Sequence, residues 1–150
     1  MKTLLTISLL LISCSTIDTQ DSFSVNKLRQ GLLSSDELVI FDQAKNIFYK
    51  GSTARIKDLS SIIEVKNMAD GHDCLCYADF VLIFSRNGSY AFALGLHPGM
   101  DLRWTNSPWL SDGKLDKFSF FLILDWIKDE IKVSKRLDNY EIPERLSKEQ

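Results

Sequence analysis

Two cysteines and a histidine are the most reactive side chains that this 150-residue chain brings into one region. Cys74 and Cys76 stand two residues apart ahead of one apolar run, and His97 ends the next apolar run. Side chains two residues apart on a β-strand project to the same side of the sheet. A strand that begins at His72 therefore places two thiols and an imidazole on one side, where we expect His97 to join them.

The two thiols allow three interpretations. A disulfide needs β-carbons about 3.8 Å apart, whereas a regular strand holds Cys74 and Cys76 about 6.6 Å apart, so the bond would be strained and redox-active. A zinc ion bound by Cys74, Cys76, His97 and His72 needs a smaller adjustment, because rotamers can bring two sulfurs to tetrahedral positions. Both cysteines can also be inert core residues. The sequence leaves all three open, so no cofactor is assigned, and zinc is the one candidate.

An enzyme would use the same residues. His97 would activate Cys74 or Cys76 as a nucleophile, with Asp101 orienting the imidazole. The chain has no G-x-S-x-G motif, Gly-rich phosphate loop or paired-carboxylate motif that would specify a reaction. A binding function is therefore preferred to catalysis.

A second group of polar and aromatic residues follows His97. An arginine that is partly buried needs a carboxylate partner, and such a pair either locks a loop or helps to bind an anion. A tryptophan in a loop either plugs the edge of a core or contacts a ligand. The candidates for a binding surface are Asp101, Arg103, Trp104, Trp109 and Asp112.

A β-hairpin should position these groups. Asn87-Gly88 separates two apolar, β-rich runs and is the strongest short signal for a type I′ turn, in which both central residues need positive φ. With a two-residue loop, Arg86 pairs with Ser89, and the numbers of all paired residues sum to 175.

That register has two consequences. It places large residues opposite small ones, with Phe84 facing Ala91 and Leu82 facing Ala93, and it sets His97 opposite Ala78. Both faces of the hairpin are apolar, so we expect a central hairpin that is covered on both sides.

The remaining pattern predicts an α+β fold, in which an antiparallel sheet built from hairpins packs against two or three helices. The last helix, capped by Asp116, is apolar nearly all round and should be buried on most of its surface. The other expected elements are a short helix from Val25 to Gly31 capped by Ser24, strands at Leu38–Phe41 and Ile47–Tyr49 around a turn, a helix at Ile56–Ile63 capped by Ser52 or Thr53, and a short strand at Leu102–Trp104.

The N-terminus carries one lysine and then an uncharged apolar run too short to span a bilayer, which is typical of a secretory signal. Its end, Leu11-Ile12-Ser13-Cys14, resembles the bacterial lipoprotein signal. The resemblance implies cleavage before Cys14, lipidation of that cysteine and a domain anchored to a membrane of the cell envelope, outside the cytoplasm. The expected segments are the signal at 1–13, the lipidated Cys14 with a flexible tether at 14–24, a single domain at 25–136 and a charged, loosely ordered tail at 137–150.

The charge balance excludes one class of partner. The chain has 18 basic and 20 acidic residues, a net charge of −2, and lacks the basic excess that nucleic-acid binding needs. The expected partners are the membrane, through the lipid, and a protein or small-molecule ligand.

The second half of the chain resembles a family of small uncharacterised bacterial proteins, which reads C-x-C-x-G-D, then L-H-H-G-x-x-L-R-W, then W-x-x-D. The similarity runs from Cys74 to Ile127, with Ala78 in place of the glycine and Pro98 in place of the second histidine. Loss of that histidine weakens a two-histidine metal site, and the resemblance implies no activity. The matching residues are Cys74, Cys76, Asp79, His97, Leu102, Arg103, Trp104, Trp109 and Asp112.

Together these patterns indicate a membrane-anchored lipoprotein whose domain acts as a binding or accessory module outside the cytoplasm. The alternative is a thiol- or zinc-dependent enzyme that uses Cys74, Cys76 and His97.

Overall fold

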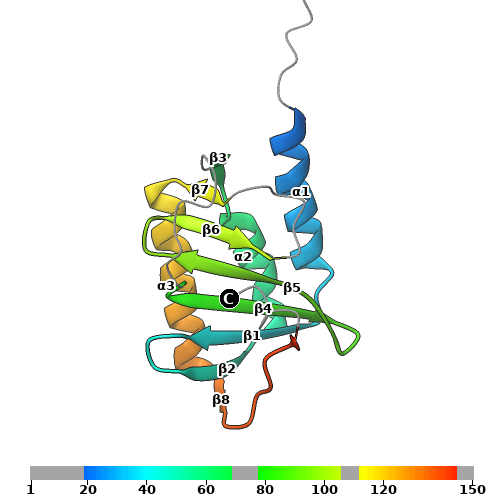
Figure 1. Ribbon diagram of the computed structural model, residues 1–150, viewed down its shortest axis with the longest axis vertical. Coiled ribbons are helices and arrows are strands. Elements are labelled where there is room, and N and C mark those ends of the chain that lie inside the picture. The colour runs from blue at the N-terminus through cyan, green and yellow to red at the C-terminus, as the bar shows by residue number, and fades with distance from the viewer. Residues whose placement is uncertain (1–18, 69–77, 106–111, 145–150) are drawn as a thin grey trace, which may run out of the picture.

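The computed structural model describes residues 19–68, 78–105 and 112–144. An eight-stranded antiparallel sheet carries the helices on one of its faces (Figure 1), which confirms the α+β fold. The helices are α1 (Thr19–Leu33), the 3₁₀ helix η1 (Thr53–Arg55), α2 (Ile56–Ile62) and α3 (Lys117–Val133). The strands are β1 (Glu37–Asp42), β2 (Ile47–Gly51), β3 (Val65–Met68), β4 (Phe80–Arg86), β5 (Ser89–His97), β6 (Asp101–Trp104), β7 (Gly113–Leu115) and β8 (Lys135–Leu137).

The expected hairpin is the centre of the sheet. The strand order is β3-β7-β6-β5-β4-β1-β2-β8, so β4 and β5 have neighbours on both sides. At their turn Asn87 has φ 52° and Gly88 has φ 73°, as the type I′ prediction requires. Aspartate and arginine side chains fix this turn to the end of α1, because the Asn87 N–H donates to Asp36 Oδ2 (2.7 Å) and Arg86 donates to the Ser34 carbonyl oxygen (3.0 Å).

The predicted register holds only next to the turn. Arg86 pairs with Ser89 and Ser85 with Tyr90, but Phe84 then pairs with Phe92, because Ala91 is an extra residue on β5. This β-bulge shifts the pairing by one residue over the rest of the hairpin. The predicted opposition of large and small residues is therefore wrong, and Leu82, for example, faces Leu94.

The bulge decides which β5 side chains face the helices. Phe92, Leu94 and Leu96 project to the same face as Leu82 and Phe84, since cross-strand partners share a side. Ala93, Gly95 and His97 consequently project to the opposite face. The main core forms between the first set and the helices, and its fully buried members include Leu28, Leu32, Leu38, Ile40, Ile56, Leu59, Ile63, Leu82, Phe84 and Ile127.

Helix α1 is longer than the sequence predicted. It begins at Thr19, so residues 19–24, which were assigned to the tether, are helical. Gly31 lies inside the helix and does not end it. The reason for a glycine at this position is packing, because a β-carbon there would lie 3.1 Å from Cε1 of Phe92. Glycine thus allows the helix to approach the ring closely.

The predicted cap of α2 is wrong. Neither Ser52 nor Thr53 caps the helix with its side chain; instead a 3₁₀ turn precedes it, and the Ser52 N–H donates to Glu130 Oε1 (2.5 Å). Arg55 Nη1 donates to the other carboxylate oxygen, Oε2 (2.9 Å). Glu130 is only 1% exposed, so this carboxylate of α3 satisfies the polar groups at the start of α2 from across the helix interface.

Helix α3 confirms one prediction and corrects another. Asp116 is its N-cap and accepts the N–H groups of Phe118 (2.7 Å) and Ser119 (3.0 Å). However, Phe118 is 72% exposed and Phe121 48% exposed, so the helix is not buried all round. The buried positions, among them Ile123 and Ile127, form one stripe against the sheet and α2.

The chain beyond α3 is more ordered than expected. Residues 135–137 form β8 and pair with β2. Tyr140 then packs on Phe48, with ring centroids 5.0 Å apart. The prediction of a loosely ordered tail at 137–150 is therefore wrong for Leu137 and Tyr140.

Within the described ranges, no helix combines the length and apolar character needed to cross a membrane.

Candidate functional site

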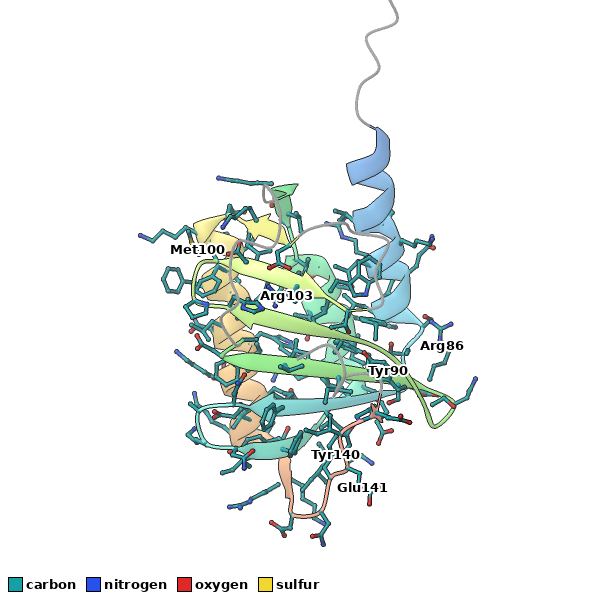
Figure 2. All side chains as sticks on the ribbon, in the orientation of Figure 1. Arg86, Tyr90, Met100, Arg103, Tyr140 and Glu141 are labelled. Atoms are coloured by element: carbon teal, nitrogen blue, oxygen red, sulfur yellow. The ribbon has the colours of Figure 1, made fainter. Side chains whose placement is uncertain are left out.

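The sheet face opposite the helices, called the open face here, has two chemically different halves. Over β4, β1, β2 and β8 its buried side chains are apolar, and charges such as the Lys50–Glu37 pair lie at the exposed rim. Over β5, β6 and β7 the charged groups are themselves partly or nearly buried. Figure 2 shows Arg103 and Tyr140 on this side of the sheet, in the two different halves. The apolar half consists of Val39, Phe41, Phe48, Ala78, Val81, Ile83, Ala93, Leu137 and Tyr140. The polar half consists of His97, Asp101, Arg103, Asp112 and Lys114.

Strand pairing brings the polar half together. His97 of β5 lies opposite Asp101 of β6, and Asp101 lies opposite Lys114 of β7. A tight turn joins β5 to β6: the Met100 N–H donates to the His97 carbonyl oxygen (3.1 Å), and Met100 has φ 63°. Because paired residues share a side, three consecutive strands present their polar side chains to the same face.

Arg103 and Asp112 form the strongest interaction in the polar half. Arg103 Nε donates to Asp112 Oδ1 (3.0 Å) and Nη2 donates to Oδ2 (2.8 Å), a bidentate pair. Asp112 is 3% exposed, and its hydrogen bond raises the pKa of Arg103. The arginine–carboxylate pair expected from the sequence is thus present, and it fixes the plane of the guanidinium group.

Asp101 and Lys114 form a second ion pair beside the first. Lys114 Nζ lies 2.6 Å from Asp101 Oδ1, and the aspartate is nearly buried. Asp101 was predicted to orient His97 for catalysis. In the structure its carboxylate binds the lysine of the next strand, a residue that sequence reasoning missed.

His97 is buried, and its surroundings hold its pKa below the ordinary value of a histidine. The residue is only 2% exposed. Burial lowers the pKa of its imidazole, and so does the nearby positive charge of Arg103. The negative charges of three aspartates raise the pKa of His97 by a smaller amount; they are Asp112, Asp101 and Asp79. A neutral imidazole has one donor and one acceptor nitrogen, so His97 can accept a proton or a metal through only one of them.

Gly95 makes the close approach of these groups feasible. A β-carbon at this position would lie 3.2 Å from Cβ of Ala78, 3.3 Å from Nε2 of His97 and 3.7 Å from Cβ of Arg103. The glycine therefore lies under the polar half, beside the end of β4. The sequence held a signal for it, because a glycine inside an apolar strand often marks a close approach.

Trp104 does not belong to this group. Its ring meets Phe92 edge-on, with centroids 6.0 Å apart, and packs against the main core on the helical face. Strand alternation separates it from Arg103, since neighbouring residues of β6 point to opposite faces. Its role is the structural one of the two that the sequence allowed.

The other predicted site residues, Cys14, His72, Cys74, Cys76 and Trp109, lie outside the described ranges. The thiol and zinc hypotheses therefore stay predictions. In the ranges that are described, no three or more His, Cys, Asp or Glu side chains are placed to hold a metal ion.

No protein-family model, curated protein or solved structure matches the chain, so the family resemblance drawn from its motifs stays a prediction and the site must be interpreted from its own geometry.

Proposed function

We propose that this protein is a bacterial lipoprotein, held by acyl groups on Cys14, whose domain acts outside the cytoplasm as a binding or accessory module. The short apolar run that ends in Leu11-Ile12-Ser13-Cys14 supports the anchor. Helix α1 begins only five residues after that cysteine. In this arrangement the folded domain stays close to the membrane surface.

The polar half of the open face is the proposed contact surface. The observation that carries this proposal is the pair of adjacent ion pairs, Arg103 with Asp112 and Asp101 with Lys114, on a face whose other half is apolar. Two nearly buried carboxylates cost desolvation energy that an apolar surface would not incur. Such a pair can lock a loop or take part in recognition, and recognition is favoured because Arg103 and Lys114 both reach the surface, with side chains 29% and 39% exposed.

The lipid anchor can be tested by metabolic labelling with an alkynyl fatty acid in a bacterial host. We expect the full chain to take up the label and to sediment with membranes. A Cys14→Ala variant should lose the label, whereas the matched Cys76→Ala variant should keep it. Label on the Cys14→Ala variant, or none on the wild type, would contradict the anchor.

The contact surface can be tested by site-specific photo-crosslinking. A photoreactive amino acid replaces Lys114 in the polar half or, as the matched control, Lys50, which lies on the apolar half of the same face because it pairs with Val39. We expect an adduct from position 114 in intact cells and none from position 50. Equal adducts at both positions would remove the special role of the polar half.

A thiol- or zinc-dependent enzyme is the second candidate, and the observation that favours it is the burial of His97 at the end of β5, opposite Asp101. We expect such an enzyme to contain one zinc per chain that is lost in a His97→Ala variant, or to have thiols of unusual reactivity. Metal analysis and thiol titration of the purified lipoprotein distinguish the cases. Absence of zinc together with unreactive thiols would contradict this candidate and leave the binding module.

A further inference from the structure

Two phenylalanine rings project from the start of α3 away from the core. Phe118 is 72% exposed and Phe121 is 48% exposed. Because they are three residues apart on a helix, both rings lie on one face, and Lys117, Asp125 and Lys128 of the same helix are also exposed there. Two adjacent exposed aromatic rings form a small apolar patch, which is a candidate contact surface.

The sequence makes this exposure unexpected. The run from Phe118 to Ile127 reads as buried nearly all round, but the sheet and α2 cover only the stripe that includes Ile123 and Ile127. Helix α3 therefore has more apolar residues than its packing against the sheet and α2 buries.

The rings lie at the same end of the molecule as the N-terminus of α1. Figure 1 shows α1 and α3 on the same face of the sheet, both beginning at the end where β3 and β7 lie. Cys14 precedes the first residue of α1, Thr19, by five positions, a stretch of chain that spans at most about 18 Å. A lipid on Cys14 therefore holds this end of the domain within reach of the bilayer.

We propose that Phe118 and Phe121 insert into the interface of the lipid bilayer that holds the anchor. The inference rests on the proposed function, because the acyl chains on Cys14 keep the rings at high local concentration next to lipid. The exposed charges on this face have both signs, Lys117 and Lys128 with Asp125, so the insertion is driven by the two rings and not by attraction to anionic headgroups.

A second copy of the chain fits the patch less well. A fully buried phenylalanine ring contributes roughly 150–250 Å² of buried surface, and these two rings are only partly exposed. Together they offer much less than the approximately 800 Å² that each partner buries in a stable protein interface. A bilayer needs no matching surface, and it is the partner to which the anchor already confines the domain.

This contact would also orient the open face. The helices lie on one side of the sheet and the polar half on the other. With the outer side of α3 against the lipid, the polar half is turned away from the bilayer and toward partners.

Tryptophan variants of the lipidated full chain provide the test. Phe121→Trp places an indole in the patch, and Val133→Trp places one at the other end of α3, where the native residue is 76% exposed. Each variant is reconstituted in vesicles of phosphatidylethanolamine and phosphatidylglycerol, with and without brominated acyl chains. The emission of the wild type is subtracted, because the chain already has three tryptophans.

We expect brominated lipid to remove most of the added emission of the Phe121→Trp variant and little of that of the Val133→Trp variant. Protein that sediments with the vesicles without quenching at position 121 would overturn the inference and leave the anchor intact. Equal quenching at both positions would overturn the proposed orientation. Protein that does not sediment with the vesicles would overturn the anchor, and the inference with it. A blue shift at position 121 without quenching, together with a doubled mass, would assign the patch to a second copy instead.

Discussion

The two halves of the open face have the same backbone architecture but opposite chemistry. In the apolar half, Ile83 is 1% exposed, and Phe41 and Phe48 stack with centroids 4.4 Å apart. In the polar half, Arg103 and Asp101 occupy the equivalent outward positions of β6, and their charges are satisfied by Asp112 and Lys114. Both halves contain buried side chains, but only in the polar half do these include carboxylates, which cost energy to desolvate.

This difference separates what the fold needs from what it can do. The apolar half shows that side chains on this face can be buried in the ordinary way, so the charges of the other half are not required by the position. We therefore expect substitutions in the apolar half to act on stability, and paired substitutions in the polar half to act mainly on binding.

The largest expected effect is in the apolar half. Ile83→Ala should lower the free energy of unfolding by about 3 kcal/mol, because it leaves a cavity beneath a fully covered strand. Ile83→Val should cost only about 1 kcal/mol. Chemical denaturation measures both. A cost below that of the valine variant would show that this half is loosely packed.

The next effect is in the polar half. Asp112→Ala should lower the free energy of unfolding by about 2 kcal/mol, because Arg103 keeps its charge in a partly buried position without its carboxylate. The double variant Arg103→Met with Asp112→Leu should recover most of this loss, since it removes both charges. Denaturation of the single and double variants decides the point. A double variant no more stable than Asp112→Ala would make the pair a stabilising element and weaken the comparison.

A smaller effect is expected where the C-terminal segment covers the apolar half. Tyr140→Ala should cost about 1 kcal/mol through loss of the ring on Phe48. Tyr140→Phe keeps the ring and should be near neutral. Thermal unfolding of both variants, compared with the wild type, measures the contribution of this segment. Equal losses would assign it to the hydroxyl group instead of the ring.

The smallest effect is a dependence on pH. The pKa of His97 in the folded protein lies below its ordinary value of 6.5, so between the two values the unfolded chain binds the proton and the folded one does not. The contribution of His97 to stability is therefore fully present above about pH 6.5 and is lost as the pH falls toward the folded-state pKa. Unfolding at pH 7 and pH 5 should show a loss in the wild type that is reduced in a His97→Gln variant. An unchanged loss would assign the dependence to other groups.

Local signals in the sequence predicted the parts of the fold that short-range chemistry decides. Positive φ at Asn87 and Gly88 follows from the turn type, and Asp116 caps α3 because its carboxylate reaches the free N–H groups of the first turn. A carboxylate partner for Arg103 followed from the need of a partly buried guanidinium, and the structure shows that of the two candidates, Asp101 and Asp112, the partner is Asp112. The turn and the helix cap depend on residues a few positions apart in the sequence, and the ion pair depends on the need of a buried charge for a partner of opposite sign.

Long-range packing decided what the sequence could not show. Nothing in the side chain of Ala91 marks it as the extra residue of a bulge. Strands β7 and β8 have three residues each and contain charged side chains, so they have no apolar alternation to detect. Lys114 entered the polar half only because β7 pairs with β6. Phe118 and Phe121 have the same residue type as buried Phe120, and only the position of the sheet distinguishes them.

The extra residue Ala91 marks the one place where β5 can lose a residue without changing sides. Ser85 pairs with Tyr90 and Phe84 with Phe92, so Ala91 has no partner of its own on β4. Deleting Ala91 would turn the bulge into a regular ladder and leave all the other cross-strand pairs in place, with Leu94 and Leu96 still toward the helices. A gene that loses this single codon should therefore still yield a protein that buries its core, with less local twist in the central hairpin.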